Sequence, residues 1–375
     1  MNNNNNNNTV DTCNNSQRTE KVYSQRAKRW KLVIAGLIAS LIVTIIVSLN
    51  IGYTFISYSD ILTFFGTRIP YVNNLIDTTA FTREQLANQA IILDIRLPRI
   101  LAALIIGAAL SASGTLFQGV FRNPMADPYV LGVSAGASVG VGIAILWGTG
   151  INFFGFPIVP IAAFLTALAT IFFVYSISKV GTRVPEMSLL LTGIAVSIFL
   201  AAIFQAMQFI TTDHKLSQLV NWQIGSITNV GWANWWAVLP FIVAGIALSY
   251  FYARDLNMIS LGEDTAQHLG VNTSRTKKIL LVLGSIMTAA AVSISGLIGF
   301  VGLMIPHITR LIVGPDHRLL IPTSALLGAI YLIICDNIAR SIGGATEVPV
   351  GIITALAGGP FLVFLLRRSR QKYRM

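Results

Sequence analysis

The chain carries very little charge. Only 11% of its 375 residues are Asp, Glu, Lys or Arg, whereas a soluble domain carries about 25%. Hydrophobic residues make up 54% of the sequence, and the mean hydropathy is +0.69. Such a chain has too little polar surface to cover a water-soluble globule, and its repeated apolar runs have the length that crosses a bilayer. The sequence therefore predicts an all-α polytopic membrane protein.

Motifs for catalysis and metal binding are also scarce. The two cysteines, Cys13 in a polar segment and Cys335 in an apolar one, predict no disulfide framework. The four histidines show no metal-ligand spacing, and there is no phosphate-binding Gly-x-x-x-x-Gly-Lys-Ser/Thr loop. Residues 132–136 match the Gly-x-Ser-x-Gly pattern of serine hydrolases, which requires a turn between a strand and a helix. Here the pattern starts an apolar run of small residues, so close helix packing is the favoured interpretation.

Ten apolar segments are predicted to cross the membrane. They cover about 32–49, 100–120, 130–147, 158–177, 187–209, 237–252, 279–294, 297–313, 320–338 and 350–366. Ten spans place both termini on one side. The Lys and Arg residues that this topology leaves outside are six of 26, namely Arg68, Arg83, Arg96, Arg99, Lys215 and Arg340. Both termini are therefore predicted to be cytoplasmic, and positive charge in alternate loops argues against a nucleic-acid partner.

The two ends of the chain differ from the apolar middle. Residues 1–30 contain the homopolymer Asn2–Asn8 and are predicted to form a disordered cytoplasmic tail. Residues 31–368 are predicted to form a single transmembrane domain, and residues 369–375 a basic cytoplasmic tail. The segment 53–94 is predicted to lie outside and has a mixed composition.

A polar stretch, Leu261–Val271, lies between two apolar runs. Ser260 and Glu263 have the spacing of a capping box, and Gly270 can take the left-handed conformation that ends a helix. The pattern predicts a short cytoplasmic helix of about two turns within 260–271. Defined ends are typical of a surface that another protein grips, and a solvated helical turn is the alternative.

Several charged residues lie at or within the outer ends of predicted spans, where their presence requires an explanation. Arg96 and Arg99 lie at the outer start of the second span, where they either snorkel to lipid headgroups or dock an acidic partner. Asp336 falls within the ninth span, where an ionisable group is costly. Arg340 follows it by four residues, so a structural ion pair is the simplest interpretation.

Several motifs together resemble one family. They are Arg96-Leu97-Pro98-Arg99, residues 107–111, Asn123-Pro124-Met125-Ala126-Asp127-Pro128 with 131–137, residues 261–270, residues 299–303 with Pro306-His307, Asp316-His317-Arg318, and residues 349–351 with 358–360. This pattern is similar to the permease subunit of type II ABC importers for iron–siderophore, haem and cobalamin. The resemblance covers about residues 30–368. It does not extend to the Asn-rich leader, and the segment 53–94 looks longer than in the family.

The resemblance implies an assembly in the cytoplasmic (inner) membrane. Each permease would have ten helices in two inverted halves and would pair with a second permease subunit. Two ATPase subunits would hold ATP-Mg on the cytoplasmic side, and a substrate-binding lipoprotein or periplasmic protein would dock outside. The chain itself would have no catalytic residue, cofactor or metal. The expected cargo is a metal chelate, with iron–siderophore favoured over cobalamin or haem. A stand-alone secondary transporter is the rival.

The resemblance also assigns roles to individual residues. The ATPase-coupling residues would be Leu261, Gly262, Glu263, Asp264, Ala266, Leu269 and Gly270. The residues that dock the binding protein would be Arg96, Arg99 and Arg340. Helix packing or the transport pathway would involve Gly107, Ser111, Gly114, Asn123, Pro124, Gly132, Gly136, Gly299, Gly302, Pro306 and Gly358. For those of the second and third spans, Gly107, Ser111, Gly114, Gly132 and Gly136, the small-residue composition by itself predicts close packing.

Overall fold

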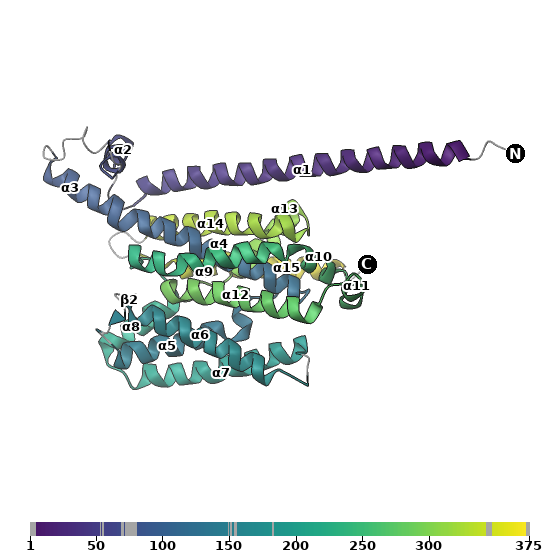
Figure 1. Cartoon of the computed structure of the whole chain (residues 1–375). Helices are drawn as coiled ribbons and strands as arrows, with labels where there is room; N and C mark the ends of the chain where they lie inside the picture. Colours follow the sequence, from purple (N-terminus) through teal and green to yellow (C-terminus); the bar gives the residue numbers. More distant parts are fainter. Residues whose placement is uncertain are drawn as a thin grey trace.

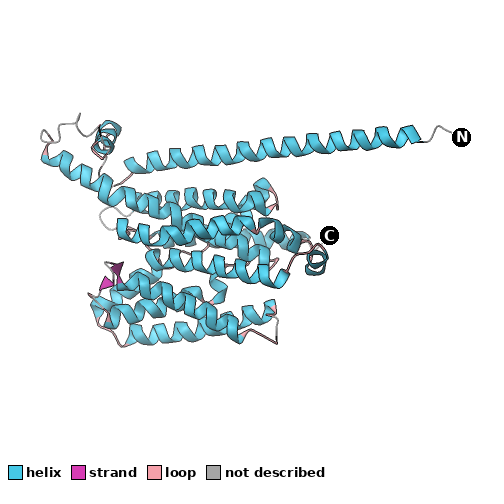
Figure 2. Ribbon diagram, in the orientation of Figure 1, coloured by secondary structure: helices cyan, strands magenta, loops and turns pink. Residues whose placement is uncertain are grey.

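The computed structural model describes residues 5–52, 54, 56–68, 71, 81–148, 150, 152–153, 156–181, 184–342 and 347–372. These residues are almost entirely helical, and most of the long helices lie side by side in one bundle (Figures 1 and 2). The strands within them are β1 (Asn152–Phe153) and β2 (Phe156–Pro157), which pair antiparallel as a small hairpin. The all-α prediction is confirmed.

The helices in chain order are α1 (Asn5–Asn50), α2 (Tyr58–Gly66), α3 (Arg83–Ala90), the π-helix η3 (Ile91–Arg96), α4 (Leu97–Val120), the 3-10 helix η4 (Pro128–Leu131), α5 (Val133–Trp147), α6 (Ile158–Ile177), α7 (Glu186–Phe209), α8 (Asp213–Ile224), α9 (Trp232–Phe251), α10 (Ala253–Ser260), α11 (Glu263–His268), α12 (Thr273–Ser295), α13 (Val301–Val313), α14 (His317–Ile342) and α15 (Val350–Lys372). Within the described residues, eight helical segments are long and apolar enough to cross a membrane. The shorter apolar helices α5 and α13 coincide with the remaining two predicted spans. The count of ten crossings and the two inverted halves stay predictions.

Two segments differ from the sequence prediction. Disorder was predicted for residues 1–30, but α1 begins at Asn5 and continues without a break into the first span. Once a helix has formed, each residue added at its end contributes one more hydrogen bond without a new nucleation step. The N-terminal half of α1 extends beyond the bundle (Figure 1). The polar region after the fifth span contains the helix α8, which was not predicted from the sequence because its apolar periodicity is weak.

The helix α4 lies at the centre of the bundle. Of its 24 residues, 21 are buried, and it packs against α9, α12, α13 and α14. Small residues allow this packing, since a Cβ atom at Gly107 would overlap the carbonyl of Gly328, and one at Gly114 would overlap that of Gly302. In lipid no hydrophobic effect drives helices together, so such close approach supplies the contacts instead.

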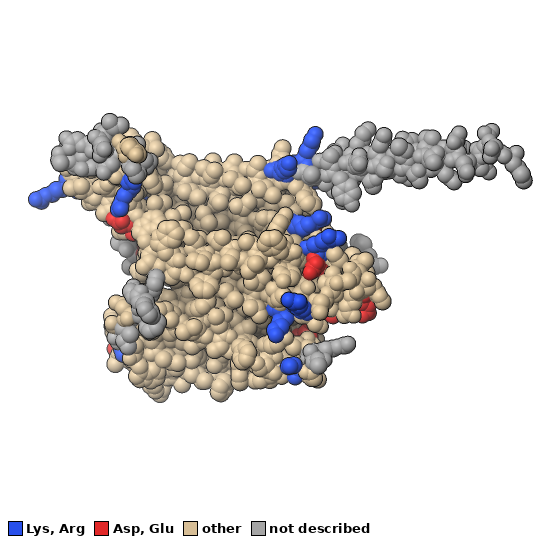
Figure 3. Space-filling view, in the orientation of Figure 1, with Lys and Arg blue, Asp and Glu red and all other residues tan. Residues whose placement is uncertain are grey.

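The flank of the bundle that faces the viewer in Figure 3 is uncharged. Figure 3 shows a broad surface without Asp, Glu, Lys or Arg between the two ends of the helices. Large apolar side chains such as Phe172, Phe199 and Phe209 are exposed on α6 and α7. Lys and Arg gather at the end that carries α11 and the C-terminus. This distribution fits a bundle whose sides face lipid or another membrane protein.

Candidate functional sites at the two ends of the bundle

The helices α10 and α11 project from the end of the bundle that is rich in positive charge. Beneath them, Ile259, Ala266 and Val271 form a small buried cluster that is separate from the main core. On the outside, Leu261 is 72% exposed and Leu269 is 59% exposed. Two leucines held outward by a buried anchor form a surface suited to contact with another protein.

The start of α11 differs from the predicted capping box. Ser260 is the last residue of α10, and its hydroxyl donates to the carbonyl of Asn257 at 2.6 Å. The chain turns at Gly262, whose φ of +127° only glycine adopts readily, and α11 then begins at Glu263. The helix has six residues, which is shorter than the two turns predicted.

The end of α11 has the geometry expected of Gly270. This residue has φ +86°, and its N–H donates to the carbonyl of Gln267. The N–H of Val271 donates to the carbonyl of Ala266 at 3.0 Å. These two hydrogen bonds form a Schellman motif, and the contact between Ala266 and Val271 completes it.

A lysine links α11 to two other helices. Lys277 of α12 forms ion pairs with Glu186, the first residue of α7, and with Glu263, the first residue of α11. Arg122 lies 3.9 Å from Glu263, and a cleft of about 390 Å³ opens beside this junction. Glu263 therefore attaches α11 to the bundle. Sequence reasoning did not identify Lys277 or Glu186, because no local spacing joins residues 91 positions apart.

A second attachment joins α10 to α14. The side-chain oxygen of Asn257 accepts a hydrogen bond from the backbone N–H of His317 at 2.8 Å, and its amide donates to Asp316 at 2.7 Å. Burial raises the pKa of Asp316, but hydrogen bonds from Arg318 and Asn257 outweigh it and hold the pKa below its usual range. The charged acceptor strengthens the bond from Asn257, so α10 is held firmly against the start of α14.

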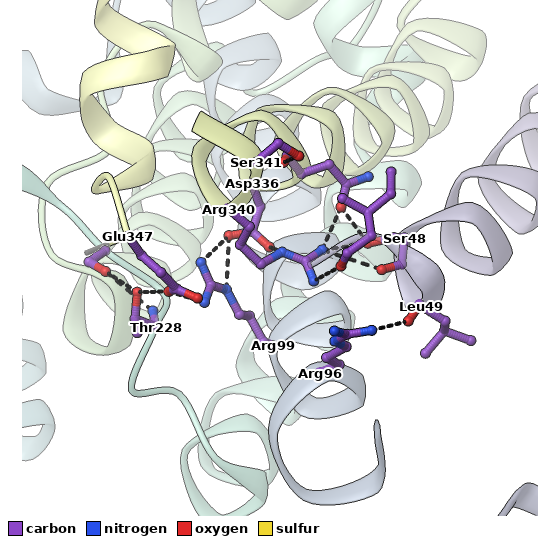
Figure 4. Close-up of polar contacts among 12 residues, drawn as sticks. Ser48, Leu49, Arg96, Arg99, Thr228, Asp336, Arg340, Ser341 and Glu347 are labelled. Atoms are coloured by element: carbon purple, nitrogen blue, oxygen red, sulfur yellow. Dashed lines mark hydrogen bonds and ion pairs between the residues drawn. The ribbon is translucent and has the colours of Figure 1, made fainter. Parts of the chain in front are cut away.

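A buried ionic cluster lies at the opposite end of the bundle, where α1 ends (Figures 1 and 4). The guanidinium of Arg99 donates to one oxygen of Asp336, from Nε at 2.9 Å and from Nη2 at 2.8 Å. The Nε of Arg340 lies 3.1 Å from the other oxygen of Asp336. The predicted pair between Asp336 and Arg340 is confirmed. Arg99, which lies 237 positions from Asp336, was not foreseen as its partner.

The cluster extends to three further parts of the chain. Glu347 accepts from Arg99 and, at 3.2 Å, from Thr228. Burial raises the pKa of Glu347, but these hydrogen bonds and the nearby arginines lower it below its usual range, so the carboxylate stays charged. Arg340 donates to the carbonyl of Ile51 at 2.9 Å, and Arg96 donates to the carbonyl of Leu49 at 2.9 Å. The cluster therefore ties the end of α1 and the loop before α9 to α4 and α14.

These positions differ from the expected docking role. Arg96, Arg99 and Arg340 are 5%, 3% and 5% exposed, so they do not present charge to a partner or to headgroups here. The acidic residues that Arg99 and Arg340 meet belong to this chain. A buried cation must be paired, and no sequence spacing showed that the chain supplies the carboxylates itself.

The small residues predicted for packing or the pathway fall into several groups. A Cβ atom at Gly107, Gly114, Gly136, Gly302 or Gly358 would meet a neighbouring helix, loop or side chain within 3 Å. Ser111 and Pro306 are buried, and Gly132, with φ +80°, ends η4 and starts α5. Gly299 faces open space, and Asn123 and Pro124 lie in an exposed turn. Most of these positions are closely packed against neighbouring segments, and a role in the transport pathway stays a prediction.

The Gly-x-Ser-x-Gly match can now be placed in the structure. Ser134 follows a 3-10 turn and is the second residue of α5, so the strand that the hydrolase motif needs is not there. An apolar helical bundle with a protruding helix pair at one end and a buried ionic cluster at the other defines a polytopic membrane protein.

The comparisons with known proteins agree with this class. Residues 27–368 match the FecCD transport family. The cobalamin import system permease protein BtuC of Halobacterium salinarum is 45% identical over 279 residues, which is 74% of each chain. The hemin transport system permease protein HmuU of Yersinia pestis is 39% identical over 75% of this chain and 84% of its own. The iron(3+)-hydroxamate import system permease protein FhuB of Bacillus subtilis is 39% identical over 75% and 72%.

A solved structure extends the match to nearly the whole bundle. It is described as an inward-facing conformation of a transporter of the metal-chelate ABC type, and it has a TM-score of 0.76 and 31% identity over 90% of this chain and 99% of its own. The chain belongs to the FecCD transport family. It is a multi-pass, non-catalytic permease subunit of an ABC importer, and this family membership implies permease and ATPase partners.

Proposed function

We propose that this chain imports a metal chelate, with an iron–siderophore as the favoured cargo and cobalamin or haem as alternatives. The relatives are named for cobalamin, hemin and iron(3+)-hydroxamate, which are bulky chelates of one metal ion. The working complex holds two copies of this permease, or one with a related subunit, together with two ATPase subunits that bind ATP-Mg. An extracytoplasmic binding protein delivers the chelate.

The observation that carries the coupling proposal is the attachment of α10 and α11. The exposed side chains of Leu261 and Leu269 offer apolar contact to the ATPase. On the inner side, Lys277 and Asn257 join these helices to α7, α12 and α14. A movement that the ATPase imposes on α11 is therefore passed to helices that cross the membrane.

The distribution of charge supports the orientation. The end that carries α11 also carries a concentration of Lys and Arg (Figure 3), which is typical of the cytoplasmic side. We place both termini in the cytoplasm and the chain in the cytoplasmic membrane. The outer ionic cluster then lies beneath the face that receives the binding protein, and it acts by fixing the shape of that face.

The test is an uptake measurement in cells that lack their own permease. The chain is expressed with candidate ATPase and binding-protein partners, and labelled iron–siderophore, haem and cobalamin are compared. Uptake that stops when the ATPase is replaced by an inactive variant supports the proposal and identifies the cargo. Uptake that continues with the inactive ATPase contradicts it and favours a secondary transporter.

A binding assay separates the coupling surface from the cargo. The ATPase is expected to co-purify with the wild-type chain and to be lost with Leu269→Asp, because a carboxylate would replace an exposed apolar contact. The matched control is Leu62→Asp, which changes a leucine that is 73% exposed on α2 at the opposite end. Equal retention of the ATPase by both variants would contradict the assignment of α11.

A further inference from the structure

Two cavities adjoin on the face formed by α6, α7 and α12. One is the cleft of about 390 Å³ beside the Lys277 junction, and the other has about 300 Å³ and lies deeper along the helices. Both are lined by Tyr175, Leu189, Lys278 and Leu281. They therefore form one continuous groove that runs from the cytoplasmic end of the bundle onto its apolar flank.

The deeper part of the groove is suited to a hydrocarbon chain. Its walls include Leu168, Ile171 and Phe172 of α6 and Val282 of α12. Phe172 is 74% exposed and Val282 is 44% exposed, so the groove opens sideways between α6 and α12 on the apolar flank of the bundle. Its volume lies at the lower end of the range of about 300–1,000 Å³ found for ligand pockets.

The side chain of Lys278 lies where the two cavities meet. The ammonium of Lys278 lies 5.5 Å from the centre of the Tyr175 ring. Among the described residues it has no carboxylate within ion-pair distance, whereas the neighbouring Lys277 pairs with Glu186 and Glu263. A ring beneath a lysine orients the ammonium without neutralising it. The outer cleft is also lined by the carboxylates of Glu186, Glu263 and Asp264, and Lys277 pairs with the first two. Lys278, at the boundary with the apolar cavity, therefore carries a positive charge that no described carboxylate contacts.

A buried hydroxyl in the wall of the deeper cavity points to the same occupant. Ser285 is 1% exposed and lines this cavity, and its hydroxyl has no hydrogen-bond partner in the described part of the chain. Ser285 follows Lys278 by seven residues on α12, a separation of about 10 Å along the helix. A buried polar group without a partner is costly, so an occupant that brings an acceptor oxygen to this depth is favoured over a plain hydrocarbon.

We propose that this groove binds one anionic phospholipid of the cytoplasmic leaflet. The headgroup phosphate lies at Lys278, an ester oxygen accepts from Ser285, and an acyl chain fills the space between α6 and α12. Lysine side chains at the cytoplasmic membrane surface attract anionic headgroups in this way. Because the groove adjoins the Lys277 junction, the bound lipid lies next to the attachment of α11. The proposal does not depend on the identity of the transported chelate.

The test uses the full-length chain in detergent with added phosphatidylglycerol or phosphatidylcholine, and native mass spectrometry counts the bound lipids. The wild type is expected to retain one phosphatidylglycerol in preference to phosphatidylcholine. Lys278→Gln should weaken binding of phosphatidylglycerol about fivefold, the value of one lysine near an anionic surface, and leave phosphatidylcholine unchanged. Ser285→Ala should weaken both lipids. Arg275→Gln is the matched control, since it removes one exposed positive charge from the same helix outside both cavities.

Three outcomes would overturn the proposal. Equal losses of phosphatidylglycerol in Lys278→Gln and Arg275→Gln would show that general surface charge holds the lipid. Equal retention of the two lipids by the wild type would remove the role of the headgroup. Displacement of phosphatidylglycerol by inorganic phosphate at the same concentration would show that a free anion occupies the Lys278 position. If instead Val282→Trp, which narrows the groove from its open side, lowers lipid retention, the acyl-chain position is supported.

Discussion

Asp336 is the residue whose replacement tests the buried ionic cluster most directly. Its side chain is 1% exposed and lies between Arg99 and Arg340. Asp336→Asn keeps the shape of the side chain and removes its charge, which leaves Glu347 as the remaining carboxylate in contact with Arg99. Removing one partner of a buried ion pair costs about 3–5 kcal/mol. Arg99 keeps Glu347, but among the described residues Arg340 keeps no carboxylate within ion-pair distance, so we expect a loss within this range.

Thermal unfolding of the purified chain in detergent measures this loss. Asp336→Asn should lower the unfolding temperature by several degrees. The matched control is Asp213→Asn, which changes an exposed aspartate at the start of α8 on the same side of the bundle and should unfold with the wild type. The energetic argument is refuted if the two variants unfold at the same temperature, because the buried carboxylate would then contribute no more to stability than an exposed one.

The remaining predictions concern packing, geometry and coupling. Gly114→Ala places a methyl group on the carbonyl of Gly302 and should lower stability by about 1–3 kcal/mol, whereas Gly36→Ala, which has open space within α1, should not lower the unfolding temperature. Lys277→Gln should leave ATP hydrolysis by the complex in place and reduce the chelate transported per ATP, and Lys277→Arg should restore this ratio; an unchanged ratio in Lys277→Gln would show that the junction transmits nothing. Arg99→Lys should destabilise the chain in thermal unfolding, because one ammonium does not reproduce the fork that reaches both Asp336 and Glu347; a wild-type unfolding temperature would contradict this.

The helices that cross the membrane could be predicted well from the sequence. The fourth predicted span, 158–177, has the same limits as α6, and the fifth differs by one residue at its start. Hydropathy is informative because lipid offers the backbone no hydrogen bonds, so an apolar run must satisfy them within its own helix. Turns and polar loops lack this constraint, which is why α8 was missed.

The partners of charged residues could not be predicted in the same way. The pair Asp336–Arg340 follows from a spacing of four on one helix. Arg99 and Glu347 are 248 residues apart, and only the packing of α4 beside α14 brings them together. The capping box failed for a related reason. Ser260 and Glu263 have the required spacing, but α10 runs through Ser260 and the turn is made by Gly262.

Glu263 shows why position in the sequence and role in coupling need separate evidence. It lies in the stretch expected to meet the ATPase, yet its carboxylate contacts Lys277 and lies near Arg122. A variant Glu263→Arg would bring a third positive charge to this point and separate α11 from α7 and α12. Loss of transport in that variant would therefore follow from a broken attachment even if the ATPase never touched residue 263. The exposed Leu269 has no such internal role, so the contact with the ATPase is tested at Leu269 and the transmission of movement at Lys277.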